Sequence, residues 1–358
     1  MTNKLVQSHS SRAPINPLRA TLHDVAALAG VSIKTVSRVV NHQGAIKEAT
    51  RQQVQAAIDQ LGYRPNGLAR GLVRRYTNTL AVVAWGLEHY GPSRTVVGIE
   101  EQAHQLGYSL VLSLSDQPDE YDREYVLDPL LSQRVEGIVW AAPEVGNNHA
   151  WLNRDELRRL PPIVFLSMQT RSGATVVAID NEAGGRRAVQ HLLELGRRRI
   201  GIITGPLAWW ETRERYLGWK NALEQIGLMP GSSLVVESMW SAAAGAQAMR
   251  QLLLQSPDLD ALFASSDQIA LGALGVIHKS GRRVPEDVAV VGFDNIPESA
   301  FFWPPLTTVC QQLTDVGHIA VQKLHQMIEE RREGSPHVEA SPTYLEPDLI
   351  IRASTVQT

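Results

Sequence analysis

The sequence offers little from which a disulfide, a metal centre or a membrane anchor could be built. It contains one cysteine, Cys310, among 358 residues, so no internal disulfide can form and a cysteine-based metal cluster is implausible. No apolar run approaches the roughly 20 residues that cross a bilayer. Residues 1–20 lack the apolar segment of a secretion signal. We therefore expect a cytoplasmic protein with no metal, no cofactor and no membrane partner.

Motifs of the common catalytic classes are also missing. The sequence has no GxxxxGKS/T phosphate loop, no HExxH zinc motif and no GxSxG nucleophile elbow. A cysteine nucleophile would have to be Cys310. These absences predict a protein that is not an enzyme.

Charge is spread unevenly along the chain. Residues 19–76 contain nine lysines and arginines but three acids, whereas the whole chain has a formal net charge of −3. The remaining residues from 77 onward are therefore acidic. A basic head on an acidic body predicts that the head alone meets a polyanion, although a solvated basic face without a partner would look the same.

Helical signals follow one another in the basic region. Thr21 is placed to cap a short amphipathic helix, and Gly30 supplies a tight turn after it. Ser32 can cap a second helix over residues 33–40. A third apolar pattern over residues 50–61 completes a small core. The order of helix, glycine turn and helix predicts a helix-turn-helix unit closed by a third helix.

The second of these helices is the expected DNA reader, because in such a unit its N-terminal residues reach base edges in the major groove. Lys34 and Arg38 can donate hydrogen bonds to guanine, and Ile33 can contact a thymine methyl group. The other polar residues assigned to the DNA interface are Thr21, Ser32, Thr35, Ser37 and Asn41. A purely structural three-helix bundle is the alternative.

The runs TLHDVAALAGVSIKTVSRVVN and TRQQVQAAIDQLGYRPNGLARGL resemble the headpiece of the lactose-repressor (LacI/GalR) family. The resemblance implies a hinge over residues 65–76 that becomes helical on operator DNA. Leu72 would enter the minor groove, and Asn66 and Ala69 would lie at the same interface. A homodimer with a two-fold axis would bind a near-palindromic double-stranded operator, and no leucine heptads follow Arg352 to build a tetramer.

Beyond residue 76, short β-rich apolar runs alternate with amphipathic helical stretches. The runs that predict buried strands are 80–84, 109–114, 137–141, 163–166, 176–179, 200–204, 234–237, 261–264 and 288–292. Helical patterns cover 94–106, 121–131, 211–226, 241–254 and 268–280. This alternation is typical of parallel sheets covered by helices on both faces, and two successive series of strands predict two lobes.

Segments such as NEAGGRRAVQHLLELGRRRIGIITGP and VPEDVAVVGFDN resemble the core of the same family. The resemblance implies a two-lobed, periplasmic-binding-protein-like (type I) α/β core, with crossings near Asp180, Val309 and Ser341. The chain is thus predicted to be a multidomain α + α/β protein. Its parts are a disordered tail (1–18), the helix-turn-helix three-helix headpiece (19–64), the hinge (65–76) and the core (77–358), with one lobe of about 77–180 and 310–340 and another of about 181–309 and 341–358.

The resemblance also carries over residues for an effector between the lobes. Arg215 matches an arginine that holds adjacent sugar hydroxyls, and Asp294 matches an aspartate that accepts hydroxyl hydrogen bonds. Trp240 and Leu313 stand where the family places apolar walls. Further candidates for the same cleft are Trp85, His89, Trp209, Trp210, Glu211 and Trp303. A structural salt bridge between Arg215 and Asp294 is the alternative.

Two cleft positions depart from the family pattern. Ser266 replaces a usual asparagine, and Ser167 replaces an aspartate that many sugar-binding members carry. The tryptophan-rich cleft favours a glycoside or a short oligosaccharide over a bare monosaccharide as the sugar effector. We therefore expect a repressor of carbohydrate-utilisation genes that the sugar releases from DNA. A regulator of the same fold that responds to a purine or another non-sugar ligand, acting as a corepressor, is the alternative; an exported sugar-binding protein would have no use for the headpiece.

Overall fold

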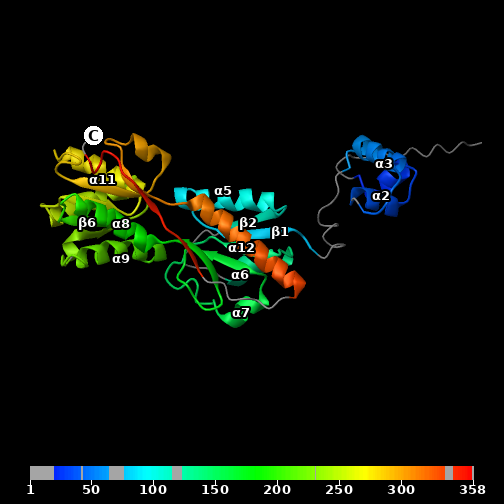
Figure 1. Cartoon of the computed structure of the whole chain (residues 1–358), viewed down its shortest axis with the longest axis horizontal. Coiled ribbons are helices and arrows are strands. Elements are labelled where there is room, and N and C mark those ends of the chain that lie inside the picture. Colours follow the sequence, from blue (N-terminus) through cyan, green and yellow to red (C-terminus); the bar gives the residue numbers. More distant parts are fainter. Residues whose placement is uncertain are drawn as a thin grey trace, which may run out of the picture. The chain divides into compact units, whose positions relative to one another are not determined.

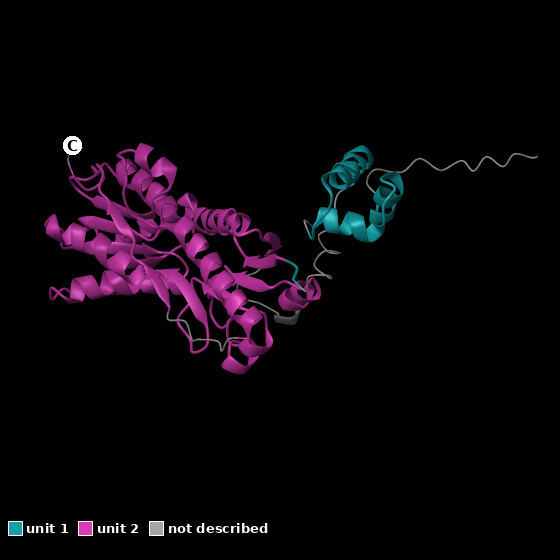
Figure 2. Cartoon of the chain, turned by 45° about the vertical axis from the view of Figure 1, so that its right-hand side comes forward, with its two compact units in different colours: residues 1–77 teal, residues 78–358 magenta. Residues whose placement is uncertain are grey.

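The computed structural model describes residues 20–41, 43–63, 76–114, 123–229, 231–334 and 342–356. The chain forms two compact units, Met1–Thr77 and Asn78–Thr358, which Figure 2 colours separately. The predicted tail and most of the predicted hinge, with Asn66, Ala69 and Leu72, lie outside the described residues. Among the described helices, none combines the length and the apolar character needed to span a bilayer.

The smaller unit is built from three helices whose ends are fixed by polar side chains. The helices are α1 (Leu22–Leu28), α2 (Ile33–Val40) and α3 (Glu48–Leu61). At α1, Asp24 N–H donates to Thr21 Oγ1 and Thr21 N–H donates to Asp24 Oδ2, which makes a capping box. Ser32 Oγ accepts from Thr35 N–H at the start of α2, directly after a turn in which Gly30 has a φ of +62°. The predicted helix, glycine turn and helix are confirmed.

A small hydrophobic core joins these helices. Val25 of α1, Val36 of α2 and Val54 of α3 are fully buried against one another. Because the apolar face of α2 points inward, its opposite face is left to solvent.

The first lobe of the larger unit is a six-stranded parallel sheet in the order β11-β5-β4-β3-β1-β2. Its strands are β1 (Thr79–Ala84), β2 (Ser109–Leu114), β3 (Gly137–Trp140), β4 (Ile163–Leu166), β5 (Thr175–Ile179) and β11 (Thr343–Leu345). Its helices are α5 (Tyr90–Gln105), α6 (Arg123–Ser132), α7 (Arg154–Arg159) and α12 (Leu313–Glu333). The central strands β1, β3, β4 and β5 are buried, as their continuous apolar runs predict.

The second lobe repeats this plan with the order β12-β10-β9-β8-β6-β7, in which β12 alone is antiparallel. Its strands are β6 (Ile200–Thr204), β7 (Val235–Glu237), β8 (Ala261–Ala264), β9 (Ala289–Asp294), β10 (Thr307–Cys310) and β12 (Asp348–Ile350). Its helices are α8 (Asn181–Glu194), α9 (Trp210–Glu224), α10 (Ala242–Gln255) and α11 (Asp267–Lys279), with short 3-10 turns at Ser232–Leu234 and Pro297–Phe301. Figure 1 shows the two lobes side by side, with segments of the chain passing from one to the other.

The chain crosses between the lobes three times. It crosses after β5 at Asp180, and again between β10 and α12, as predicted. The predicted third crossing near Ser341 is wrong by several residues. Because β11 pairs with β5 in the first lobe, the chain crosses after Leu345, before β12 joins the second sheet. The first lobe therefore extends to residue 345.

Glycines allow the helix pairs to approach closely. A Cβ built on Gly218 of α9 would lie 2.2 Å from the Glu182 carbonyl oxygen of α8, and one on Gly185 would lie 2.5 Å from the Arg215 carbonyl oxygen. In the α10–α11 pair, a Cβ on Gly272 would lie 1.9 Å from the Ala242 carbonyl oxygen. These contacts leave no room for a side chain, and those between α8 and α9 fix where α9 presents Arg215.

We expect Gly272→Ala to destabilise the core by about 1–3 kcal/mol, because the added methyl group meets backbone that cannot move aside. Gly275→Ala is the matched control on the same helix, since a Cβ there meets nothing within 4 Å. The control should be neutral or stabilising by up to about 1 kcal/mol through the helix propensity of alanine. Urea unfolding followed by circular dichroism compares the two, and equal midpoints would refute the close approach of α10 and α11.

Candidate functional site: an inter-lobe cavity and a basic helix

A cavity of about 420 Å³ lies between the two lobes of the larger unit. It is lined by loops and helix starts that follow the carboxyl ends of strands in both sheets, as expected for α/β lobes. All but two of the effector residues predicted from the sequence line it. Those that do are Trp85, His89, Ser167, Trp209, Glu211, Arg215, Trp240, Ser266, Asp294 and Leu313.

Arg215 lines the cavity and is buried and held in one orientation. Its Nε donates to Asn181 Oδ1 at 2.8 Å, and its Nη1 donates to the Ser265 carbonyl at 2.7 Å. The guanidinium carbon lies 3.8 Å from the centroid of the Phe293 ring. Burial lowers the pKa of Arg215, and the nearby Asp294 partly offsets this. Two of its three guanidinium nitrogens are therefore engaged by the protein itself.

Asp294 ends β9 beside this arginine. Its Oδ1 lies 3.9 Å from Arg215 Nη1, which is at the limit of an ion pair, and it accepts a hydrogen bond from Gln311 Nε2 at 2.6 Å. Burial raises the pKa of Asp294, while Arg215 and Gln311 lower it in part. Its backbone φ is +114°, a left-handed conformation that is costly for a residue with a side chain. The chain holds this carboxylate at the cavity wall at the expense of local strain.

Three tryptophans make an aromatic wall beside these charged groups, and the Arg215 guanidinium carbon lies 5.8 Å from the centroid of the Trp240 ring. Trp85 of the first lobe lies 4.9 Å from Trp209 of the second, and Trp209 lies 6.0 Å from Trp240, both measured between ring centroids. A Cβ on Gly205 would lie 2.3 Å from the Trp240 ring, so the glycine gives the indole its space. The Nε1 atom of Trp240 is buried with no hydrogen-bond partner. This wall presents both apolar faces and one unused donor.

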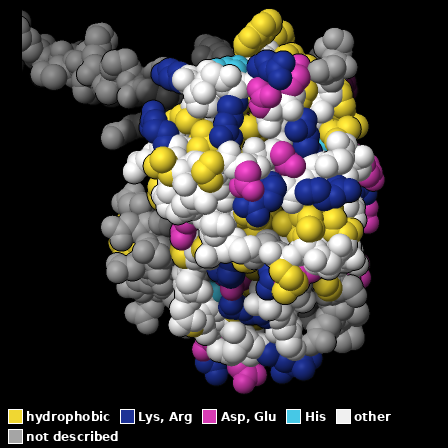
Figure 3. All heavy atoms as spheres, turned by 90° about the vertical axis from the view of Figure 1, so that its left-hand side faces the viewer, with side chains coloured by type: hydrophobic (Ala, Val, Ile, Leu, Met, Phe, Trp, Pro, Cys, Tyr) yellow, Lys and Arg dark blue, Asp and Glu magenta, His cyan; other side chains and the backbone are white. Residues whose placement is uncertain are grey.

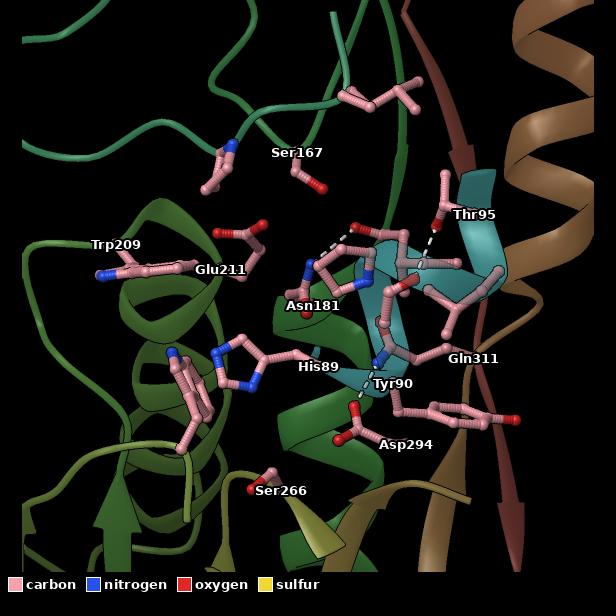
Figure 4. A pocket seen from close by; sticks show the side chains of 18 of the residues that line it. His89, Tyr90, Thr95, Ser167, Asn181, Trp209, Glu211, Ser266, Asp294 and Gln311 are labelled. Carbon is pink, nitrogen blue, oxygen red and sulfur yellow. Dashed lines mark hydrogen bonds between the residues drawn. The ribbon is translucent and has the colours of Figure 1, made fainter. Parts of the chain in front are cut away.

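The two serines that depart from the family pattern behave differently. Ser266 caps α11 by accepting a hydrogen bond from Ile269 N–H at 3.2 Å, so its hydroxyl is already engaged. Ser167 has a φ of +54° and faces Glu211 of the second lobe across the cavity. Figure 4 shows Ser167 above Glu211, with Trp209 and Asn181 on either side of the carboxylate.

Trp210 and Trp303 do not line the cavity, contrary to the prediction. Trp303 is 84% exposed after the Pro297–Phe301 turn. Trp210 is buried and packs into the hydrophobic core of the first lobe, although it begins α9 of the second. The backbone N–H of Trp210 donates to the Glu144 carbonyl, and Val145 forms an antiparallel β-bridge with Trp209. This backbone pairing turns Trp210 away from the cavity and joins the lobes at a further point.

We expect Trp210→Ala to lower the stability of the core by about 3–5 kcal/mol, because it leaves a cavity in the first lobe and removes an inter-lobe contact. Trp210→Phe, which keeps most of the apolar contact, should lose less. Thermal unfolding of the two variants beside the parent chain measures this. A Trp210→Ala variant that unfolds at the parent temperature would show that the indole does not anchor α9.

Sequence reasoning missed several polar residues of the cavity. Asn181 and Gln311 lie beside the first two crossings and hold Arg215 and Asp294, while Tyr90 and Thr95 line the wall from α5. The signal for Asn181 and Gln311 was their place next to crossings that the sequence had located. Among the described residues, no group of three histidine, cysteine, aspartate or glutamate side chains is arranged to hold a metal ion.

The smaller unit presents a separate candidate surface on α2. Ile33, Lys34 and Arg38 are exposed, whereas Val36 and Val39 are buried beneath them. Some of the polar residues assigned to the DNA interface also stabilise the helix itself, since the Asn41 side-chain amide donates to the Ser37 carbonyl at 2.8 Å. The second lobe, in contrast, mixes both signs of charge over the end face shown in Figure 3.

Residues 21–66 match the family described as "Bacterial regulatory proteins, lacI family", and residues 189–355 match the "Periplasmic binding protein-like domain". The chain is 34% identical to the lactose operon repressor of Escherichia coli (strain K12) over 307 residues, which cover 86% of this chain and 84% of that protein. It is 34% identical to the HTH-type transcriptional repressor PurR of Haemophilus influenzae (strain PittEE) over 337 residues, covering 94% and 98%.

Solved structures agree with this result. The lac repressor dimer bound to operator and the anti-inducer ONPF superposes with a TM-score of 0.83 at 32% identity, covering 94% of this chain and 99% of that chain. The complex of the transcriptional regulator CelR with cellobiose superposes with a TM-score of 0.69 at 35% identity, covering 94% of this chain and 100% of that chain. The predicted helix-turn-helix headpiece and the two-lobed core are thereby confirmed.

Proposed function

Because the chain belongs to the lacI family of bacterial regulatory proteins, we propose that it is a transcriptional repressor released from its operator by a sugar. Its relatives are DNA-binding repressors and not enzymes, and this similarity is the basis for assigning it to the transcriptional repressors. The effector is the proposed part. It is a glycoside or short oligosaccharide bound in the cavity between the core lobes, and the regulated genes serve carbohydrate use.

The single observation that supports a sugar effector is that fixed polar groups and an aromatic wall line the same cavity. A pyranose has hydroxyl groups around its edge and apolar C–H faces. Arg215 and Asp294 supply a fixed donor and a fixed acceptor for adjacent hydroxyls, and Trp85, Trp209 and Trp240 supply flat apolar surfaces. Three indoles offer more surface than one ring can cover, which supports a ligand of more than one unit. The similar CelR structure contains cellobiose, a disaccharide.

Release from DNA would follow from a difference in ligand affinity between two lobe arrangements. Residues of both lobes line the cavity, so a ligand there senses their relative position. The arrangement that the sugar favours would separate the DNA-reading units of a homodimer. By linkage, operator DNA must weaken sugar binding by the same factor.

A purine effector is the second candidate, because the chain is as similar to the repressor PurR as to the lactose operon repressor. A flat base could also stack on the tryptophans and bind Arg215 and Asp294 through ring nitrogens. It would then act as a corepressor, which strengthens operator binding.

One titration separates these candidates. Full-length protein is bound to a fluorescent fragment that carries the palindromes near its own gene, and anisotropy is followed as ligands are added. The panel consists of cellobiose, lactose, maltose, sucrose, trehalose, guanine and hypoxanthine. Release by one sugar supports the proposal, whereas tighter binding with a base supports the alternative. Operator binding that no sugar and no base changes would contradict both.

A further inference from the structure

The cavity between the lobes is rich in carboxylates. Its acidic lining residues are Glu88, Glu211 and Asp294, and its one arginine is Arg215. Arg215 already lies beside Asp294, so its charge is largely compensated before a ligand arrives. No lysine is among the described residues that line the cavity. By formal charge, an anionic ligand would therefore enter a site of its own sign.

Glu211 is the carboxylate whose bonding is incomplete. It lies in the first turn of α9, and its Oε2 atom is buried with no hydrogen-bond partner. Burial raises the pKa of Glu211, and Arg215 and the Ser167 hydroxyl lower it in part. A buried acceptor without a donor costs free energy that a ligand donor would recover. The unpaired acceptor Oε2 therefore favours a ligand that carries an O–H or N–H donor.

The surroundings of this oxygen restrict the ligand further. Trp209 and Asn181 flank the carboxylate in Figure 4, and Ser167 faces it from the first lobe. Trp240 adds a second unsatisfied atom, its buried Nε1 donor, in the same cavity. A hydroxyl group can donate to Glu211 and can also accept a hydrogen bond, whereas a fully ionised phosphate or carboxylate group offers acceptors only.

We propose that Glu211 is a specificity-determining residue, which accepts a hydrogen bond from an uncharged hydroxyl-bearing effector and rejects its phosphorylated counterpart. The inference rests on the proposed sugar effector and adds the class of sugar. A sugar phosphate would place its charge near the buried carboxylate of Glu211, and like-charge repulsion of this kind discriminates against a close analogue. Glu211 also restores, from the second lobe, the acidic group that Ser167 does not offer from the first.

The experiment measures binding of paired probes to the full-length protein by isothermal titration calorimetry. The probes are the neutral disaccharides of the panel above and the 6-phosphate of each one that binds. The variants are Glu211→Gln, which keeps the shape and removes the charge, and Glu214→Gln as a matched control. Glu214 lies on the same helix, is partly buried and does not line the cavity.

The parent chain should bind a neutral disaccharide at least 100-fold more tightly than its 6-phosphate. Glu211→Gln should weaken the neutral ligand by roughly 10- to 100-fold, as expected for a charged hydrogen bond, and narrow the gap to the phosphate. Glu214→Gln should change neither. Unaltered affinities in Glu211→Gln would overturn the role of Glu211.

Failure of this inference differs from failure of the sugar effector. If the parent chain prefers a sugar phosphate and that compound releases the operator, the sugar effector stands and the inference is wrong. If hypoxanthine or guanine alone binds, the sugar effector is wrong, and the same variants are titrated with that base. Loss of affinity in Glu211→Gln would then still support a donor to Glu211, and no loss would exclude it.

Discussion

Replacing Lys34 and Arg38 together by alanine should abolish operator binding at physiological salt while the headpiece stays folded. Both side chains are exposed on α2, the helix that enters the major groove in this class of DNA reader. Each base contact of this kind contributes about 1–3 kcal/mol, so the double variant should bind roughly 10²- to 10⁴-fold more weakly. Fluorescence anisotropy on the operator fragment measures the loss, and circular dichroism checks the fold.

Arg51→Ala is the matched control, because it removes a headpiece cation from α3 that lies near Glu48 instead of on the reading face. It should weaken operator binding only slightly and equally for specific and random DNA, since an exposed cation away from the bases adds to the general attraction for phosphates. A double variant that keeps operator affinity, or a control that loses as much, would show that α2 is not the reading helix.

Local signals were enough to predict the headpiece. A cap needs one polar side chain and a turn needs one glycine, and Thr21, Ser32 and Gly30 stand where these are required. Buried parallel strands are also visible in sequence because both of their faces are apolar. For this reason β1, β3, β4, β5, β6, β8 and β9 lie within two residues of their predicted positions. The prediction of buried strands at 109–114 and 234–237 was right in position but wrong in burial, because β2 and β7 are edge strands and β2 has no buried residue.

Elements that depend on distant partners were harder to predict. Strand β11 has three residues, none of them buried, so only its pairing with β5 shows that the first lobe continues to Leu345. Trp209 and Trp210 are equivalent in sequence. Their opposite directions come from backbone pairing with residues 144–146, more than 60 positions earlier in the chain. Spacing within one helix cannot reveal a contact of that kind.

The chemistry of the cavity divides in the same way. Arg215 and Asp294 could be assigned because they stand at motif positions, yet their proximity at 3.9 Å does not decide between a salt bridge and a ligand site. The deciding observations are contacts to other elements. Asn181, Ser265 and Phe293 hold the guanidinium so that it does not depend on Asp294. An arginine held in this way is preorganised for a ligand.

Arg215→Ala should therefore remove the response to the effector while operator binding persists. The variant loses charged hydrogen bonds to the ligand, each of about 1.5–3 kcal/mol, and leaves Asp294 without its cation, so ligand affinity should fall by roughly 100-fold or more. The sugar that releases the parent protein should fail to release this variant at the same concentration. Anisotropy on the operator fragment, with and without that sugar, measures both properties in one titration.

Two further variants separate a ligand contact from a general loss of structure. Arg215→Lys keeps the positive charge near Asp294 but loses the planar fork, so it should retain stability better than Arg215→Ala and still respond poorly to the sugar. Lys220→Ala is the matched control. Lys220 lies on the same helix, and its Nζ atom lies 3.7 Å from Glu224 Oε1, so this variant should respond to the sugar as the parent does. If Arg215→Ala is released by the sugar at the parent concentration, Arg215 is a structural partner of Asp294, and the effector must be held by other residues of the cavity.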